Sequence, residues 1–132
     1  MRCSLRLVLP LALITGILVG CGSGSPSGGG DLSGKEFQNA QGKRSVTVEA
    51  GDNNFTPAYV EVSTGTTVKF EYTGRNHHNE IAVDNGFKSI TRTFNTGDSV
   101  TVTFDKPGEY PYYCSLHGTP TRGMTGGIRV VE

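Results

Sequence analysis

The sequence predicts an all-β fold, a Greek-key sandwich or barrel of about eight strands. From residue 45 to the C-terminus, short segments alternate apolar and polar residues with a period of two, which indicates strands with one buried and one exposed face. Turn-forming residues separate these segments, and no stretch has convincing helical periodicity. Short strands at regular spacing are typical of β-sandwiches and barrels.

The predicted strands cover most of the chain between residues 45 and 131. The alternating segments are residues 45–49, 59–63, 66–72, 80–83, 90–94, 99–104, 108–114 and 127–131. Segment 66–72 illustrates the pattern, because Val68, Phe70 and Tyr72 fall on one face of it. Clusters of Gly, Asn, Asp and Pro lie between the segments and predict tight turns.

Length and charge exclude several classes of protein. The chain has 132 residues, which suits one domain, and 12 basic residues are balanced by 12 acidic ones. Nucleic-acid binding requires an excess of basic residues, so it is not expected. Three cysteines are too few, and odd in number, for a disulfide-rich scaffold.

The N-terminal residues have a different composition. Residues 1–20 are predicted to be a signal peptide, because Arg2 and Arg6 precede an apolar core at residues 7–19 that is too short to span a bilayer comfortably. The end of this core, Leu18-Val-Gly-Cys21, resembles the lipobox of bacterial lipoproteins, and a plain secretion signal is the alternative. We therefore expect an exported protein, lipid-anchored through Cys21 to the outer face of the cell membrane or to the periplasmic side of an envelope membrane.

Residues 21–42 are expected to link this anchor to a folded domain at residues 43–132. Residues 22–30 contain only Gly, Ser and Pro, a composition that cannot form a core. Residues 31–41 are polar, with Leu32 and Phe37 as the only large apolar residues, and we expect them to be poorly ordered. The remaining residues are enough to bury a small core.

Cys114 is the first candidate for chemistry. Cys3 leaves with the leader and Cys21 is lipidated in this interpretation, so Cys114 is the single remaining thiol of an exported protein. His117 and Met124 follow it in a Gly-containing loop that can bring the three side chains together. Thiolate, imidazole and thioether are soft donors, which favour copper over magnesium or calcium. A buried, inert cysteine is the plainer alternative.

A trigonal copper site of two histidines and one cysteine needs one more strong donor. It must come from the adjacent pair His77 and His78, because the chain has only three histidines. Loops from distant strands gather at one end of a Greek-key sandwich, so this pair can approach Cys114. We favour His78 because Asn79 follows it and because strand alternation points Ile81 and Val83 inward. His77 is then a solvated loop residue.

These residues resemble the cupredoxin family, of the plastocyanin type, over about residues 45–131. The resemblance rests on Phe55-Thr-Pro57 followed by Val60, Val62, Gly65 and Val68, on His78-Asn79, on Tyr113-Cys-Ser115 with His117, and on Gly123-Met124 with Gly126 and Ile128. The C-terminal block is specific, whereas the strand pattern alone would not be.

The resemblance implies one copper ion bound by His78, Cys114 and His117, with Met124 as a weak axial ligand. It also implies that Asn79 hydrogen-bonds across to the ligand loop and holds it closed, as residues around metal ligands commonly do.

Two departures from plastocyanins bear on this site. Six residues separate His117 from Met124, two more than in typical plastocyanins, which affects the bond from Met124 and the reduction potential. Leu116 stands where proline is usual, so its backbone N–H is free to donate a hydrogen bond near the site.

By this resemblance the protein is a mononuclear type 1 (blue) copper protein that carries single electrons between a protein donor and a protein acceptor. We expect a membrane-tethered monomer that is not an enzyme, with electrons passing at the surface edge of His117. Three alternatives remain: a copper storage, delivery or resistance protein with the same ligands, a copper oxidase or reductase, and a non-metal extracellular interaction module. Three histidines are too few for the second cluster that substrate chemistry at copper would need.

Overall fold

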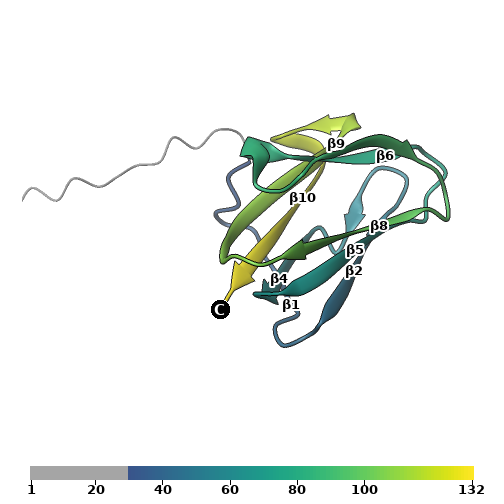
Figure 1. Cartoon of the computed structure of the whole chain (residues 1–132). Coiled ribbons are helices and arrows are strands. Elements are labelled where there is room, and N and C mark those ends of the chain that lie inside the picture. Colours follow the sequence, from purple (N-terminus) through teal and green to yellow (C-terminus); the bar gives the residue numbers. More distant parts are fainter. Residues whose placement is uncertain (1–29) are drawn as a thin grey trace, which may run out of the picture.

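The computed structural model describes residues 30–132, which form two β-sheets packed face to face (Figure 1). Each predicted segment contains a strand: β2 (Ser45–Ala50), β4 (Tyr59–Ser63), β5 (Thr66–Tyr72), β6 (His78–Ala82), β7 (Ile90–Phe94), β8 (Ser99–Phe104), β9 (Gly108–Thr119) and β10 (Arg122–Val131). Two short strands, β1 (Gln38–Asn39) and β3 (Phe55–Thr56), and a 3-10 turn, η1 (Val83–Asn85), complete the elements. The predicted all-β sandwich is confirmed.

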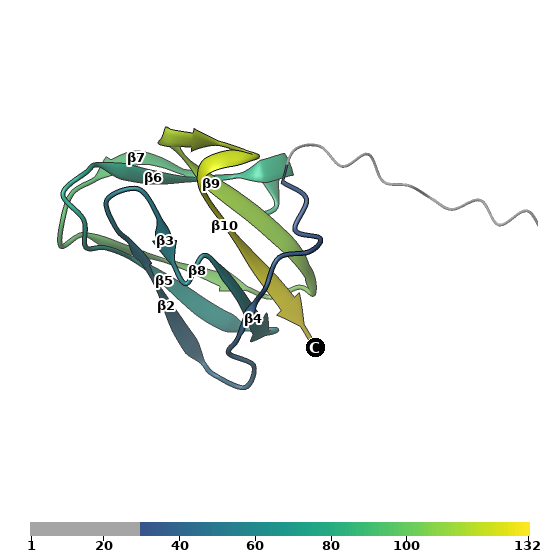
Figure 2. The ribbon, with the colours of Figure 1, turned by 180° about the vertical axis from the view of Figure 1, so that it is seen from behind.

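Strands that are distant in the sequence lie side by side in the larger sheet, whose order is β1-β4-β10-β9-β6-β7. Strand β10 pairs with β4 in parallel and with β9 in antiparallel orientation, so the last strand of the chain is internal to its sheet. The smaller sheet has the order β3-β2-β5-β8. Figure 2 shows β6 and β7 along one border of the molecule, above β2, β5 and β8.

The core consists of alternate residues of the two sheets. In β2 and β5 every second residue is buried, among them Val48, Ala50, Phe70 and Tyr72. The ring of Tyr112, from β9, meets Phe70 edge-to-face with centroids 5.2 Å apart. Burying one such side chain stabilises the folded state by roughly 1.5–3 kcal/mol. Together these residues form one apolar layer between the two sheets.

Residues 31–41 pack against the larger sheet, and the expectation that they are poorly ordered is wrong. Leu32 is 3% exposed, and β1 adds a short parallel strand beside β4. Phe37 meets the ring of Tyr59 at 5.8 Å between centroids, and the guanidinium of Arg129 lies 3.8 Å from the centre of the Phe37 ring. A few apolar residues therefore order a segment that is polar on average.

The predicted signal peptide, the predicted lipidation site Cys21 and the linker as far as residue 29 lie outside the described residues. Among residues 30–132, no helix has the length and apolar character that crossing a bilayer requires.

Candidate metal centre

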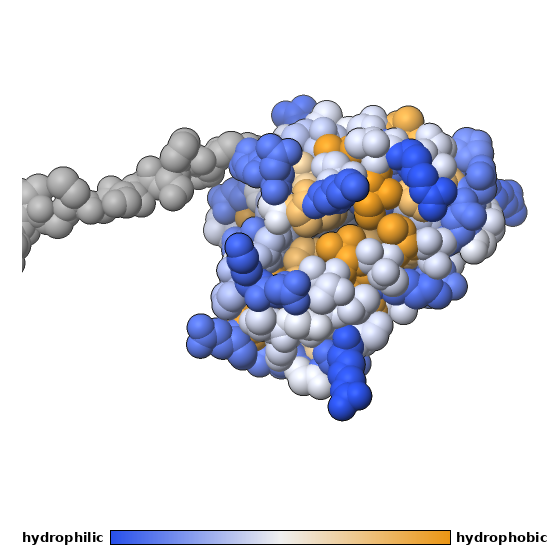
Figure 3. All heavy atoms as spheres, viewed as in Figure 1, coloured by the Kyte–Doolittle hydropathy of each residue, from blue (hydrophilic) through white to orange (hydrophobic). Residues whose placement is uncertain are grey.

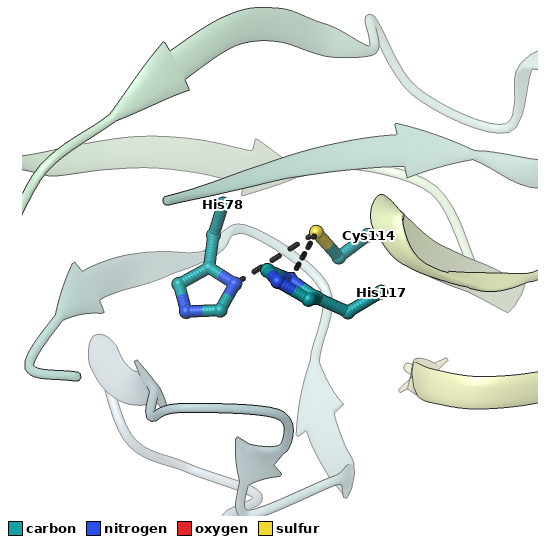
Figure 4. A group of neighbouring side chains, drawn as sticks. All are labelled: His78, Cys114 and His117. Atoms are coloured by element: carbon teal, nitrogen blue, oxygen red, sulfur yellow. Dashed lines mark hydrogen bonds between the residues drawn. The ribbon is translucent and has the colours of Figure 1, made fainter. Parts of the chain in front are cut away.

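Three predicted ligands, His78, Cys114 and His117, come together between β6 and β9 (Figure 4). Their proximity follows from the antiparallel pairing of these two strands. The Cys114 Sγ atom is 3.8 Å from Nδ1 of His78 and 3.6 Å from Nδ1 of His117. The three donor atoms all lie within 4.8 Å of one another.

This spacing fits a single metal ion. Nitrogen and sulfur ligands at about 2.0–2.3 Å from one ion, arranged as a triangle, are roughly 3.5–4 Å apart, and the sulfur lies at such a distance from each of the two nitrogens here. Cys114 and His78 are fully buried and His117 is half-buried. One thiolate with two imidazoles in a trigonal set is the donor set of blue-copper sites.

His78 belongs to the hydrophobic core as well as to the donor group. Burial lowers the pKa of His78, and the neighbouring His117 lowers it further. The ring therefore stays neutral near pH 7 and keeps a nitrogen lone pair for a metal. It lies nearly parallel to the Tyr72 ring, with centroids 6.3 Å apart, and Tyr72 in turn stacks on Phe94 at 4.3 Å.

Asn79 makes the hydrogen bonds that were expected across to the ligand segment. The backbone N–H of Ser115 donates to Asn79 Oδ1 at 2.9 Å, and Asn79 Nδ2 donates to Ser115 Oγ at 2.9 Å. Asn79 follows His78 and Ser115 follows Cys114, so these bonds join the two strands at the donor atoms. The link holds the separation between the His78 and Cys114 side chains.

Glu80 is a buried residue beside the donors that was not predicted from the sequence. It is 0% exposed, and the Tyr72 hydroxyl donates a hydrogen bond to its Oε2 atom. Within the described residues, Oε1 of Glu80 has no hydrogen-bond partner. Burial raises the pKa of Glu80 to about 7, against the opposing effect of the Tyr72 bond. Counting alternation from His78 would have indicated it, because residues two apart in a strand share a face.

The expected inward direction of Ile81 is wrong. Strand β6 buries His78 and Glu80, whereas Ile81 is half-buried, because the strand starts its alternation at the metal donor. Val83 is buried, but it lies in η1 after the strand has ended. The structure groups His78 with the other donors, and His77 is exposed as expected. Of the two reasons for choosing His78, the one from Asn79 was correct and the one from strand alternation was incorrect.

Met124 is 1% exposed and belongs to the same buried cluster as Cys114. In place of the expected short loop, β9 and β10 continue as a hairpin, with an irregularity in register between Gly123 and Thr125 that includes Met124. Gly123 has a φ of +76°, and a Cβ atom there would lie 2.5 Å from the carbonyl oxygen of His117. The hairpin path needs glycine at this position, and the axial role of Met124 stays a prediction.

The surface beside the donors is apolar at one residue. Leu116 precedes His117 and is 51% exposed. Among residues 30–132 it is the single large apolar side chain that is exposed. His117 is therefore the donor closest to solvent, next to a side chain that favours contact with another apolar surface.

Comparison with known protein families gives a match over most of the chain. The sequence model of the family described as "Cupredoxin-like domain" matches residues 18–125. CopI of Pseudomonas aeruginosa, described as a copper-resistant cuproprotein, is 41% identical over 66 residues, which are 49% of this chain and 36% of CopI. This chain therefore spans little more than a third of that relative.

Solved structures with similar folds include copper proteins. The Cu-containing nitrite reductase of Thermus scotoductus is 35% identical, with a TM-score of 0.54 over 66% of this chain and 22% of the reductase. The purple cupredoxin of Nitrosopumilus maritimus is 30% identical, with a TM-score of 0.53 over 64% of this chain and 98% of that protein. Amicyanin of Paracoccus versutus, at 22% identity and a TM-score of 0.56 over 66% of this chain and 81% of amicyanin, shows the shared fold.

Proposed function

This chain belongs to the family of cupredoxin-like domains, and on that premise we propose that it is a type 1 (blue) copper protein that carries single electrons. Copper is the cofactor that the donor set and the copper-binding relatives support. The observation that carries the proposal is the grouping of His78, Cys114 and His117, with their donor atoms within 4.8 Å of one another. Bound copper supplies a one-electron couple between Cu(I) and Cu(II).

The protein keeps the donors in place while the charge of the site changes. His78 is fixed by core packing, and the Asn79–Ser115 hydrogen bonds fix its distance from Cys114. The full burial of Cys114 excludes water from the sulfur. Donors that move little between the two oxidation states favour rapid electron transfer, and Met124 would complete the set as a weak axial donor.

The proposed route for electrons is the half-buried ring of His117 beside exposed Leu116. A protein donor and a protein acceptor would dock there in turn, and the carrier would act as a monomer and not as an enzyme. A lipid on Cys21 would keep the domain close to membrane partners and raise their effective concentration. The linker between Cys21 and the domain would allow it to reorient.

Visible spectroscopy and voltammetry of the purified protein with one equivalent of Cu(II) test this proposal. We expect an intense thiolate-to-copper absorption band and a reversible one-electron wave. Cys114→Ser should abolish both, whereas the matched control His77→Ala, at an exposed histidine beside His78, should keep both. Absence of the band in the unaltered protein would overturn the blue-copper assignment.

A role in copper resistance or delivery is the second candidate, because the 41% identical relative CopI is described as a copper-resistant cuproprotein. The same donors would serve this role, but the metal would have to leave the site. Rapid loss of copper to a chelator, together with an absorption band that lacks a reversible wave, would favour copper handling over electron transfer.

A further inference from the structure

A groove lies between β7 and β8, which are edge strands of the two sheets. Its volume is about 480 Å³, and the half-buried side chains of Ile90, Val100 and Val102 form its apolar part. Lys88 and Arg92 line the same groove and are exposed. Figure 3 shows apolar surface gathered on one face of the molecule, with hydrophilic residues around it. No metal donor lines this groove, so it is a second feature of residues 30–132.

The backbone of β8 is available on the side of the groove. Within the described part of the chain, β8 pairs with β5 alone and β7 with β6 alone. A free strand edge presents unpaired N–H and C=O groups, which an extended peptide can pair with as an added strand. Val100 and Val102 are half-buried and alternate with exposed residues of β8. The side chains of an added strand alternate with the same period of two, so every second one can contact these valines.

The charges of the groove select the kind of occupant. Lys88 and Arg92 are its charged residues, and no carboxylate lines it. The guanidinium of Arg92 is positioned 4.0 Å from the centre of the Phe94 ring. A second copy of this chain docked by the same groove would place equal charges opposite each other, which disfavours pairing. An acidic segment would instead find two cations and no competing anion.

We propose that this groove binds an extended acidic segment of a partner protein, in which apolar residues occupy alternate positions. The segment adds a strand to the free edge of β8, its apolar side chains contact Ile90, Val100 and Val102, and its carboxylates lie close to Lys88 and Arg92. None of its residues is His117 or Leu116, so a partner can occupy it while the half-buried edge of His117 stays accessible.

A short capped peptide that alternates valine and glutamate is the probe for this site. Nitrogen-15 NMR of the Cu(I) protein should show peptide-induced shifts confined to the backbone amides of β7 and β8. The double variant Lys88→Glu, Arg92→Glu should weaken binding at least about tenfold. The matched control Lys43→Glu, Arg44→Glu makes the same change of charge at two exposed residues outside the groove and should leave the affinity unchanged. Circular dichroism reports whether each variant is folded.

Several outcomes would overturn the proposal. Equal binding of a peptide with lysine in place of glutamate would remove the charge argument, and equal binding of a peptide N-methylated at alternate residues would remove strand addition. Shifts located elsewhere, or no binding, would do the same. Concentration-dependent dimerisation with shifts at β7 and β8 would assign the groove to a second copy of this chain. None of these results bears on the copper band or the redox wave, so the two proposals fail separately.

Discussion

The two histidine donors lie in contrasting parts of the molecule. His78 is 0% exposed, in a strand that also buries Asn79 and Glu80, and its ring lies parallel to Tyr72. His117 is half-buried in a hairpin, next to exposed Leu116. One donor is therefore part of the hydrophobic core, and the other is at the border between core and solvent.

This difference would meet two separate requirements of the electron carrier that we propose. Fixed donor positions need dense packing and hydrogen bonds that hold the neighbouring backbone, which the His78 side provides through the Tyr72 ring and the Asn79–Ser115 bonds. Exchange with a partner needs a short path to the surface, which the His117 side provides. Changes on the His78 side should therefore alter folding stability, and changes at the His117 surface should alter exchange rates.

The largest expected effect is a pH dependence of stability due to Glu80. Its pKa is raised to about 7 in the folded protein, above the ordinary value of 4.5. The folded state therefore binds the proton more tightly, and the stability from this group is full below pH 4.5 and lost as pH rises through 7, by on the order of 3 kcal/mol. Urea unfolding of the metal-free protein from pH 5 to 8 measures it.

Glu80→Gln is the control for that measurement, because glutamine can still accept the Tyr72 hydrogen bond but does not titrate. The lowered pKa of His78 has the opposite sign and removes stability as pH falls below 6.5, so the difference between the two proteins is the informative quantity. Parallel pH profiles for the two proteins would contradict the assignment to Glu80.

A smaller loss, of about 2 kcal/mol or more, is expected for Gly123→Ala in the hairpin. The alanine backbone would have to keep a strained positive φ, and its Cβ atom would lie 2.5 Å from the His117 carbonyl oxygen. Gly97→Ala is the matched control, with a φ of +90° and no atom within 4 Å of the new Cβ, and should cost about 1 kcal/mol. Chemical denaturation compares them, and equal costs would show that the close contact is not limiting.

Asn79→Ala tests the link between the two sides of the site. It removes the hydrogen bonds to Ser115 from a residue that is 6% exposed, and should lower the free energy of unfolding by about 1–2 kcal/mol. Copper release to a chelator should also become faster. Asn54→Ala removes one exposed hydrogen bond to Thr56 and should change stability by less than about 0.5 kcal/mol. Equal effects of the two substitutions would contradict a special role for Asn79.

The smallest change in stability is expected for Leu116→Ser at the exposed surface. The free energy of unfolding should change by less than about 0.5 kcal/mol, because the side chain is 51% exposed. Electron exchange with a redox partner protein should nevertheless slow, if the partner docks on this side chain. Stopped-flow kinetics measures the rate, and an unchanged rate would move the docking surface away from Leu116.

The strands and the pairing of Cys114 with His117 were predictable because local patterns encode them, whereas His78 was chosen over His77 partly for an incorrect reason. Period-two alternation identified β5 and β8, and the spacing of Cys114 and His117 identified the donor segment. Strands β1 and β3 have two residues each, too few for any periodicity. The extension of β9 and β10 was missed because Gly118, Pro120 and Gly123 are residues that usually predict turns.

Other features depend on the register between distant strands, which no local pattern contains. Ser115 lies 36 positions from Asn79, and their hydrogen bonds depend on how β9 aligns with β6. Glu80 was missed for another reason, because a carboxylate in an alternating strand is ordinarily expected to face solvent. Its inward direction follows only once His78 is known to start the buried face of β6.

Strand β10 follows all the other described strands in the sequence and yet lies between β4 and β9. Tyr59 of β4 pairs with Gly127 of β10, so this pairing joins residues that are separated by most of the described sequence. Contacts of such long range form slowly, so we expect the pairing of β4 with β10 to form late in folding. Cys114 and His117 on β9 therefore gain the support of β10 only at this late step of folding. Truncation of the last strand would leave Cys114 as a thiol without its enclosing sheet.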